Sequence, residues 1–86
     1  SMLMGAISCL HEGDLEQSFS HWFRALQDHG KTNEVRCCRE LLMAEIAHQQ
    51  SVVRRHLDEE TGFGVERTQN YLESLRSIER RIHFLK

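Results

Sequence analysis

The chain has 86 residues, of which 40% are hydrophobic and 28% are charged, a balance typical of folded domains and too apolar for intrinsic disorder. Its formal net charge is -2, with acidic and basic residues mixed along the sequence. This mixture argues against nucleic acid and against an anionic membrane surface as partners. No apolar run approaches the roughly 18 residues that a membrane span needs, and the N-terminus lacks secretory features. We expect one helical domain at 1–86, with 1–2 a remnant ahead of a fragment of a longer protein.

The three cysteines, Cys9, Cys37 and Cys38, are an odd number, and adjacent cysteines seldom pair with each other. Because no secretion signal is present, the sequence predicts reduced thiols in an intracellular protein, either cytoplasmic or nuclear.

Glycines divide the chain into four predicted helices, and the absence of proline leaves each free to be long. The first is expected from about Leu3 to Glu12. The second begins after Gly13 and runs to about His29, because Asp14 is a good N-cap and Gln17 completes a capping-box pattern. Its apolar side chains share one wide face, namely Leu15, Phe19, Trp22, Phe23 and Leu26.

The third predicted helix starts after Thr32 or Asn33, either of which can cap it, and continues to about Glu60, a length of about 40 Å. Its apolar stripe is interrupted by Gln49 and consists of Val35, Cys38, Leu42, Ile46, Val53 and Leu57. After a turn at 61–64 the fourth helix is expected from about Val65 to near the C-terminus. Its apolar residues recur with heptad spacing at Tyr71, Leu75, Ile78, Ile82 and Leu85.

The stretch from Ala6 to Leu26 carries a recognisable pattern of small, turn-forming and aromatic positions. Its matching residues are Ala6, Gly13-Asp14-Leu15-Glu16-Gln17-Ser18, Trp22 and Ala25-Leu26. In these positions the stretch resembles one tetratricopeptide (TPR) helix pair, and it shares the local look of the microtubule-interacting-and-trafficking type of bundle. No second repeat follows at a shift of 34 residues, so the resemblance implies a single TPR-like hairpin at 6–26. We predict an all-α fold: a four-helix up-down bundle, with this hairpin followed by a longer antiparallel helical hairpin.

The six histidines and three cysteines raise the question of a metal site. Structural zinc sites use pairs such as C-x₂₋₄-C or H-x₃₋₅-H, because those spacings let two side chains converge on one ion. Neither pair occurs, and no catalytic signature surrounds any cysteine. We therefore predict no catalytic residue, no metal ligand and no cofactor, and a protein that is not an enzyme.

Two sets of residues leave alternatives open. Trp22 and Phe23 point about 100° apart on their helix, so either both are core residues or one anchors a partner. The basic residues Arg54, Arg55 and His56, with those of the fourth helix, lie among acidic residues in the same hairpin. They are interpreted as a solvated face with i,i+4 pairs, and acidic or phosphorylated partners are the weaker alternative.

The two helices of the second hairpin are longer than those of the first. Part of their apolar stripe is therefore expected to be exposed to solvent, unless the third helix breaks near His48–Ser51. An uncovered stripe usually marks a partner or a second copy of the chain. The sequence thus predicts a protein-protein interaction or self-association module, with a homodimer as the leading form. A monomeric groove for a peptide or helix is the alternative, and a Cys/His metal-responsive regulatory domain is less favoured. The predicted interaction residues are Leu42, Ile46, Val53, Tyr71, Leu75, Ile78 and Ile82.

Overall fold

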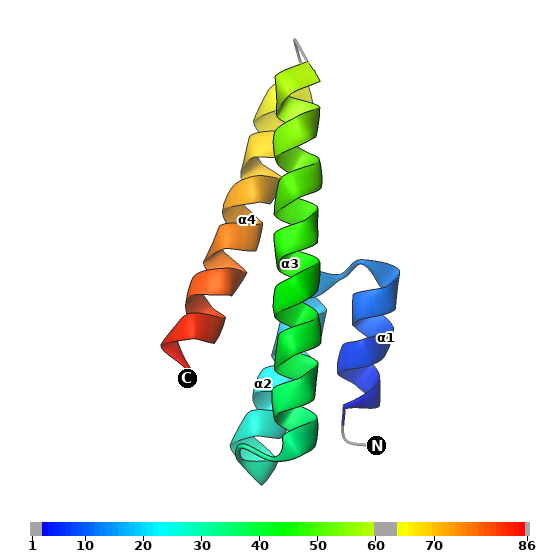
Figure 1. The fold of residues 1–86 in the computed structure, drawn as a ribbon, viewed down its shortest axis with the longest axis vertical. Helices are drawn as coiled ribbons and strands as arrows, with labels where there is room; N and C mark the ends of the chain where they lie inside the picture. Colours follow the sequence, from blue (N-terminus) through cyan, green and yellow to red (C-terminus); the bar gives the residue numbers. More distant parts are fainter. Residues whose placement is uncertain (1–2, 60–63, 86) are drawn as a thin grey trace. The chain divides into compact units, whose positions relative to one another are not determined.

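The computed structural model describes residues 3–59 and 64–85, and these residues are all-helical, with no strand among them. Four helices follow in order: α1 (Met4–Glu12), α2 (Leu15–His29), α3 (Asn33–Glu59) and α4 (Gly64–Phe84) (Figure 1). The helical class and the four predicted segments are therefore confirmed. The predicted turn at 61–64 lies outside the described residues except for Gly64, which begins α4. No helix in the described part of the chain is long and apolar enough to span a membrane.

The chain divides into two compact units, Ser1–Glu45 and Ile46–Lys86, and each is described by itself. The first unit holds α1, α2 and the beginning of α3. The second holds the rest of α3 and all of α4. The single domain expected at 1–86 stays a prediction.

The turn between α1 and α2 contains the cap that ends α1 and the cap that begins α2, at the adjacent residues Gly13 and Asp14. Gly13 has a left-handed φ of 82°, its N–H donates to the Leu10 carbonyl at 3.1 Å, and the Asp14 N–H donates to the Cys9 carbonyl at 2.9 Å. This pair of bonds is the Schellman motif, which satisfies carbonyls at the end of a helix. The Asp14 carboxylate then accepts the Gln17 N–H at 3.1 Å, which confirms Asp14 as the N-cap of α2.

The long helix α3 is capped by the first of its two candidates. The Thr32 hydroxyl accepts the Val35 N–H at 3.1 Å, and the helix then runs from Asn33 to Glu59. It continues without interruption through His48–Ser51, so the break considered there is absent.

The first unit is held together by close helix contact at small residues. The Ser18 hydroxyl donates to the Ala6 carbonyl at 2.8 Å, and both residues are fully buried. At Gly5 a Cβ atom would lie 2.9 Å from Nδ1 of His21, so α1 and α2 approach too closely there for a larger residue without a shift of the imidazole. The buried residues of this unit are Leu3, Ala6, Leu15, Ser18, Phe19, Trp22, Ala25, Val35, Cys38 and Leu42.

The second unit pairs the later part of α3 with α4, which runs back along it (Figure 1). Its buried residues are Ile46, Gln50, Val53, Leu72, Leu75, Ile78 and Ile82. Two details differ from the predicted stripes: Gln50 is buried while Gln49 is half-buried, and Leu72 is buried while Tyr71 is exposed. In each case neighbouring positions are about 100° apart on the helix, and packing selects the one that faces inward.

Candidate functional site

The predicted interaction residues lie mostly in the interior of the folded chain. All except Tyr71 are at most 5% exposed, whereas Tyr71 is 40% exposed on α4. Tyr71 is thus the predicted residue that a partner reaches most easily. Whether the full set forms an interface stays a prediction. The buried members are Leu42, Ile46, Val53, Leu75, Ile78 and Ile82.

Tyr71 lines an open groove between α3 and α4 in the second unit. The groove has a volume of about 330 Å³ and a mostly apolar lining. Residues from two turns of α3 form one wall, and residues from the first half of α4 form the other. The full lining is Gln49, Val52, Val53, His56, Arg67, Thr68 and Tyr71.

The apolar part of the groove is partly open to solvent. Val53 is buried at 5% exposure, while Val52 and Tyr71 are 41% and 40% exposed, one on each wall. A large apolar side chain costs free energy when it is left in water, about 25 cal/mol for each Å². A side chain inserted between Val52 and Tyr71 would therefore gain binding energy from area that is now exposed.

The charge on the groove lining comes from Arg67. Arg67 and His56 are both exposed and come from opposite walls, and none of the described lining residues is acidic. Within residues 3–59 and 64–85, the Arg67 guanidinium makes no ion pair or hydrogen bond. The Thr68 hydroxyl donates to the Gly64 carbonyl at 2.7 Å, so its proton is already used within α4. Arg67 is therefore the strongest free polar donor on the groove.

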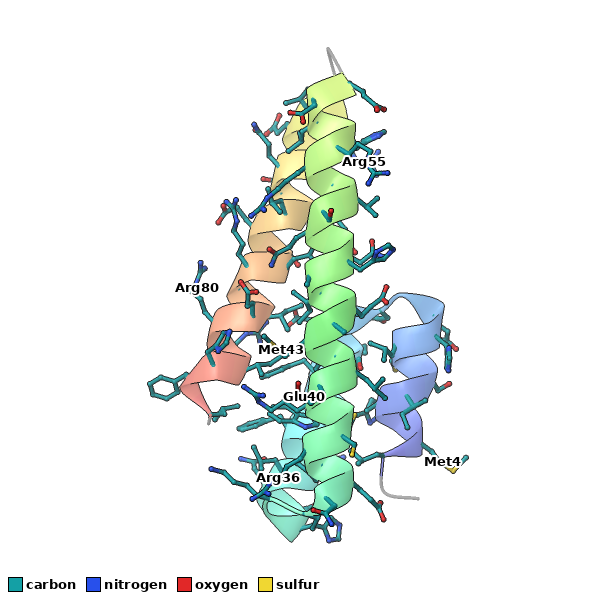
Figure 2. The ribbon with its side chains drawn as sticks, viewed as in Figure 1. Met4, Arg36, Glu40, Met43, Arg55 and Arg80 are labelled. Atoms are coloured by element: carbon teal, nitrogen blue, oxygen red, sulfur yellow. The ribbon has the colours of Figure 1, made fainter. Side chains whose placement is uncertain are left out.

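Other exposed apolar side chains are dispersed over three helices. Met4 is 66% exposed and projects outward from α1 (Figure 2), and Ile7 on the same helix is 38% exposed. Leu41 of α3 is 52% exposed, and Phe84 at the end of α4 is 89% exposed. Isolated apolar side chains of this kind are common on monomeric proteins and do not by themselves indicate a partner.

The cysteines and histidines do not gather into a metal site in the described part of the chain, where no three metal-ligating side chains come together. All three thiols are free. Burial raises the pKa of the Cys38 thiol. Partial burial, with the carboxylates of Glu12 and Asp14, raises the pKa of Cys9. A raised pKa lowers the thiolate fraction and so disfavours nucleophilic or ligand chemistry at both thiols near neutral pH.

The adjacent aromatic residues Trp22 and Phe23 of α2 differ in burial. Trp22 is 1% exposed and belongs to the core, whereas Phe23 is half-buried. The Phe23 ring stacks on Phe19 with centroids 5.9 Å apart and an interplanar angle of 6°. Trp22 is thus a core residue, as the core interpretation predicted, whereas the half-buried Phe23 is only partly so and the alternative of a partner anchor stays open for it.

Three groove residues, Val52, Arg67 and Thr68, are not predicted from the sequence, because they lie beside the centres of the apolar stripes. Val52 and Arg67 flank the stripes of their helices and interrupt no pattern. A usable signal was Val52 beside Val53, since two adjacent β-branched residues on one helix cannot both lie at the centre of a narrow face.

Comparison of the chain with protein-family models, with curated proteins and with solved structures finds no match.

Proposed function

We propose that the chain is a protein-protein interaction module that binds through the groove between α3 and α4, and that it is not an enzyme. The observation that carries this proposal is the pair of half-exposed apolar residues, Val52 and Tyr71, on opposite walls of an open and mostly apolar groove. Interfaces are typically anchored by aromatic or aliphatic side chains that meet a complementary apolar pocket.

Two binding modes are compatible with such a module. Self-association to a homodimer is one, and reception of a peptide or helix from another protein is the other. The groove favours the second mode, because it is already open. A dimer made through Ile46, Leu75 and Ile78 would have to expose residues that are at most 1% exposed in the folded chain.

The first hairpin serves as scaffold in this proposal. A TPR-like packing of α1 on α2 is supported by the hydrogen bond from Ser18 to the Ala6 carbonyl, which joins two small residues at the helix contact. The up-down order of the four helices and an intracellular location belong to the same proposal. The location is supported by the three free thiols.

The proposal is tested by sedimentation equilibrium at micromolar concentration, together with selection from a displayed library of helical peptides. The groove variant is Val52→Gln with Tyr71→Gln, which replaces the two exposed apolar residues by a good helix former. The matched control is Ala47→Gln, an exposed position of α3 outside the groove. Circular dichroism checks that each variant keeps its helicity.

We expect either a dimer or a set of selected peptides whose binding is lost in the groove variant and kept in the control. A clean monomer of 10.1 kDa that selects no groove-sensitive peptide would refute the proposal.

A further inference from the structure

We infer that the groove receives an acidic amphipathic helix from another protein. This inference rests on the proposed function, because it specifies the partner of the same groove. The partner helix presents one or two apolar anchors between Val52 and Tyr71, and a carboxylate one turn away that pairs with Arg67.

The open form of the groove favours side-chain anchors over a small molecule. Small-molecule sites usually enclose most of the ligand surface, whereas this groove of about 330 Å³ is open to solvent. The α3 wall extends from Gln49 to His56, which corresponds to about 10 Å of helix, or two turns. On a partner helix, two apolar anchors spaced by three or four residues and a carboxylate one further turn away together span the same length.

The helical form of the partner follows from the two walls. Both are helices, and a third helix that lies along their shared groove completes a three-helix layer with side chains packed as ridges into grooves. An extended strand would find no unpaired backbone edge here, since the backbone groups of both helix interiors are bonded within their helices.

The charge of the groove selects an acidic partner. The Arg67 guanidinium lies on the α4 wall, and the described lining includes no carboxylate that would compete with a partner. The nearby acidic residues Glu59 and Glu66 are exposed but do not line the groove. A guanidinium without an ion pair can form a bidentate bond with a carboxylate, which fixes orientation as well as adding affinity.

The chain's own exposed apolar residues match the groove less well. Phe84 follows Arg81 and His83 in the last turn of α4, so a second copy would bring like charge toward Arg67. The first turn of α1, where Met4 is exposed, contains no acidic residue.

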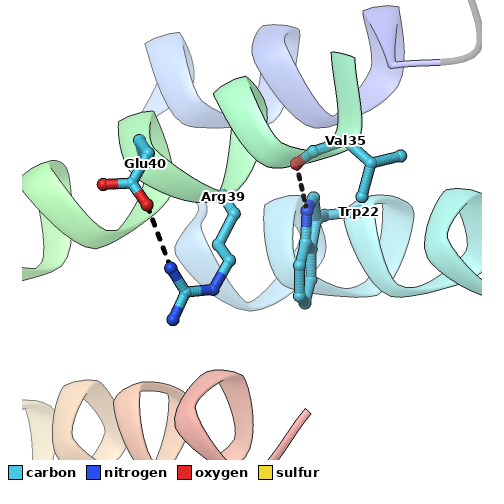
Figure 3. A network of polar contacts seen from close by, with 4 residues as sticks. All are labelled: Trp22, Val35, Arg39 and Glu40. Carbon is cyan, nitrogen blue, oxygen red and sulfur yellow. Dashed lines mark hydrogen bonds and ion pairs between the residues drawn. The ribbon is translucent and has the colours of Figure 1, made fainter. Parts of the chain in front are cut away.

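Leu41 is the exception among the exposed apolar residues, because acidic residues flank it in the sequence, with Glu40 directly before it and Glu45 four positions after it. Its neighbour Glu40 already pairs with Arg39 at 3.0 Å (Figure 3). Docking of Leu41 from a second copy would compete with that pair, so it is the less favourable occupant.

The test uses two synthetic 16-residue helical peptides and the full chain. The acidic peptide consists of alanine and glutamine, into which leucines are placed four residues apart. Glutamates are placed one helical turn from the leucines. The basic peptide replaces each glutamate by lysine. Binding is measured by fluorescence anisotropy, and the contact surface by amide chemical-shift changes on ¹⁵N-labelled protein.

We expect the acidic peptide to bind more tightly than the basic one, with amide chemical-shift changes concentrated at 49–56 and 67–71. Its binding should weaken as salt is added. Arg67→Glu should weaken the acidic peptide about tenfold and strengthen the basic one. The matched control is Arg55→Glu, since Arg55 projects from the side of α3 that faces away from α4 and does not line the groove (Figure 2). This control should leave both peptides unchanged.

Four results would overturn the inference. Equal affinity for the two peptides, or an Arg67→Glu variant with unchanged affinity, would contradict an acidic partner. In that case, groove-sensitive peptides from the library would still support the proposed function. A concentration-dependent dimer that masks the 49–56 and 67–71 amides makes a second copy the occupant. Failure of both peptides refutes the inference, and if the library selection is also empty and the protein is a clean monomer, the proposed function is refuted with it.

Discussion

The indole Nε1 of Trp22 donates a hydrogen bond to the backbone carbonyl of Val35 at 2.9 Å (Figure 3). This bond joins the middle of α2 to the first turn of α3. The Trp22 ring is 1% exposed and lies 5.9 Å from the Phe19 ring, measured between centroids. A buried indole needs a partner for its N–H, and here the partner is a carbonyl in the first turn of α3. The first unit is thereby anchored through one side chain.

Replacing Trp22 by Phe should lower the free energy of unfolding by about 2 kcal/mol, since the hydrogen bond and part of the buried ring are lost. Trp22→Ala should cost about 3–5 kcal/mol. Urea denaturation followed by circular dichroism measures both. A Trp22→Phe variant as stable as the wild type would show that the bond to Val35 adds nothing beyond ring packing.

The contact between Ser18 and Ala6 offers a matched pair of serine substitutions on α2. Ser18→Ala removes a buried hydrogen bond between two helices and should cost about 1 kcal/mol. Ser20→Ala removes a bond to the Glu16 carbonyl at 3.2 Å within the same helix, at an exposed position, and should change stability by less than about 0.5 kcal/mol. Equal effects of the two substitutions in urea denaturation would contradict this account of the helix contact.

The helix ends could be predicted because their causes are local. Gly13, Asp14 and Thr32 act through hydrogen bonds to residues three to five positions away, and such bonds are visible in the sequence as spacing. The predicted bounds of the helices accordingly differ from the observed ones by about a residue, which is the ordinary variation of helix ends.

The groove could not be predicted in the same way. Its lining depends on where two helices approach each other and on which of two adjacent residues turns inward. Tyr71 and Leu72 satisfy the heptad spacing almost equally, as do Gln49 and Gln50, and the periodicity alone does not choose between them. Arg67 lies outside every apolar pattern, so its place on the groove follows from the packing of α3 on α4.

The three thiols should react with N-ethylmaleimide at pH 7.4 in a fixed order. Cys37 is exposed and should react first, followed by the half-buried Cys9. Cys38 is 3% exposed and its pKa is raised by burial, so it should react last, at least about tenfold more slowly than Cys37. Intact and peptide mass spectrometry over time gives the order. Early labelling of Cys38 would contradict its burial in the first unit.

Alkaline pH should destabilise the fold through the buried Cys38 thiol. The pKa of Cys38 is raised in the folded state, so the unfolded chain loses this proton first. Stability is therefore fully present below the unfolded thiol pKa of about 8.5 and falls as pH rises through the folded value. Cys38→Ala should lower stability at pH 7 because it leaves a small cavity, and should flatten the decline above pH 8.5. An unchanged slope in denaturation curves from pH 7 to 10 would assign the decline to other groups.

The buried side-chain amide of Gln50 should destabilise the second unit. Gln50 is 8% exposed, and its Nε2 atom has no hydrogen-bond partner among the residues that the structure describes. An unsatisfied buried amide costs about 1–3 kcal/mol, and leucine has nearly the same volume without the polar group. Gln50→Leu should therefore raise the free energy of unfolding by about 1–2 kcal/mol. Gln27→Leu, at an exposed position of α2, is the control and should change it by less than about 0.5 kcal/mol. A loss of stability in Gln50→Leu would show that the amide is hydrogen-bonded in solution, and its side-chain ¹⁵N–H resonances would then exchange slowly with solvent.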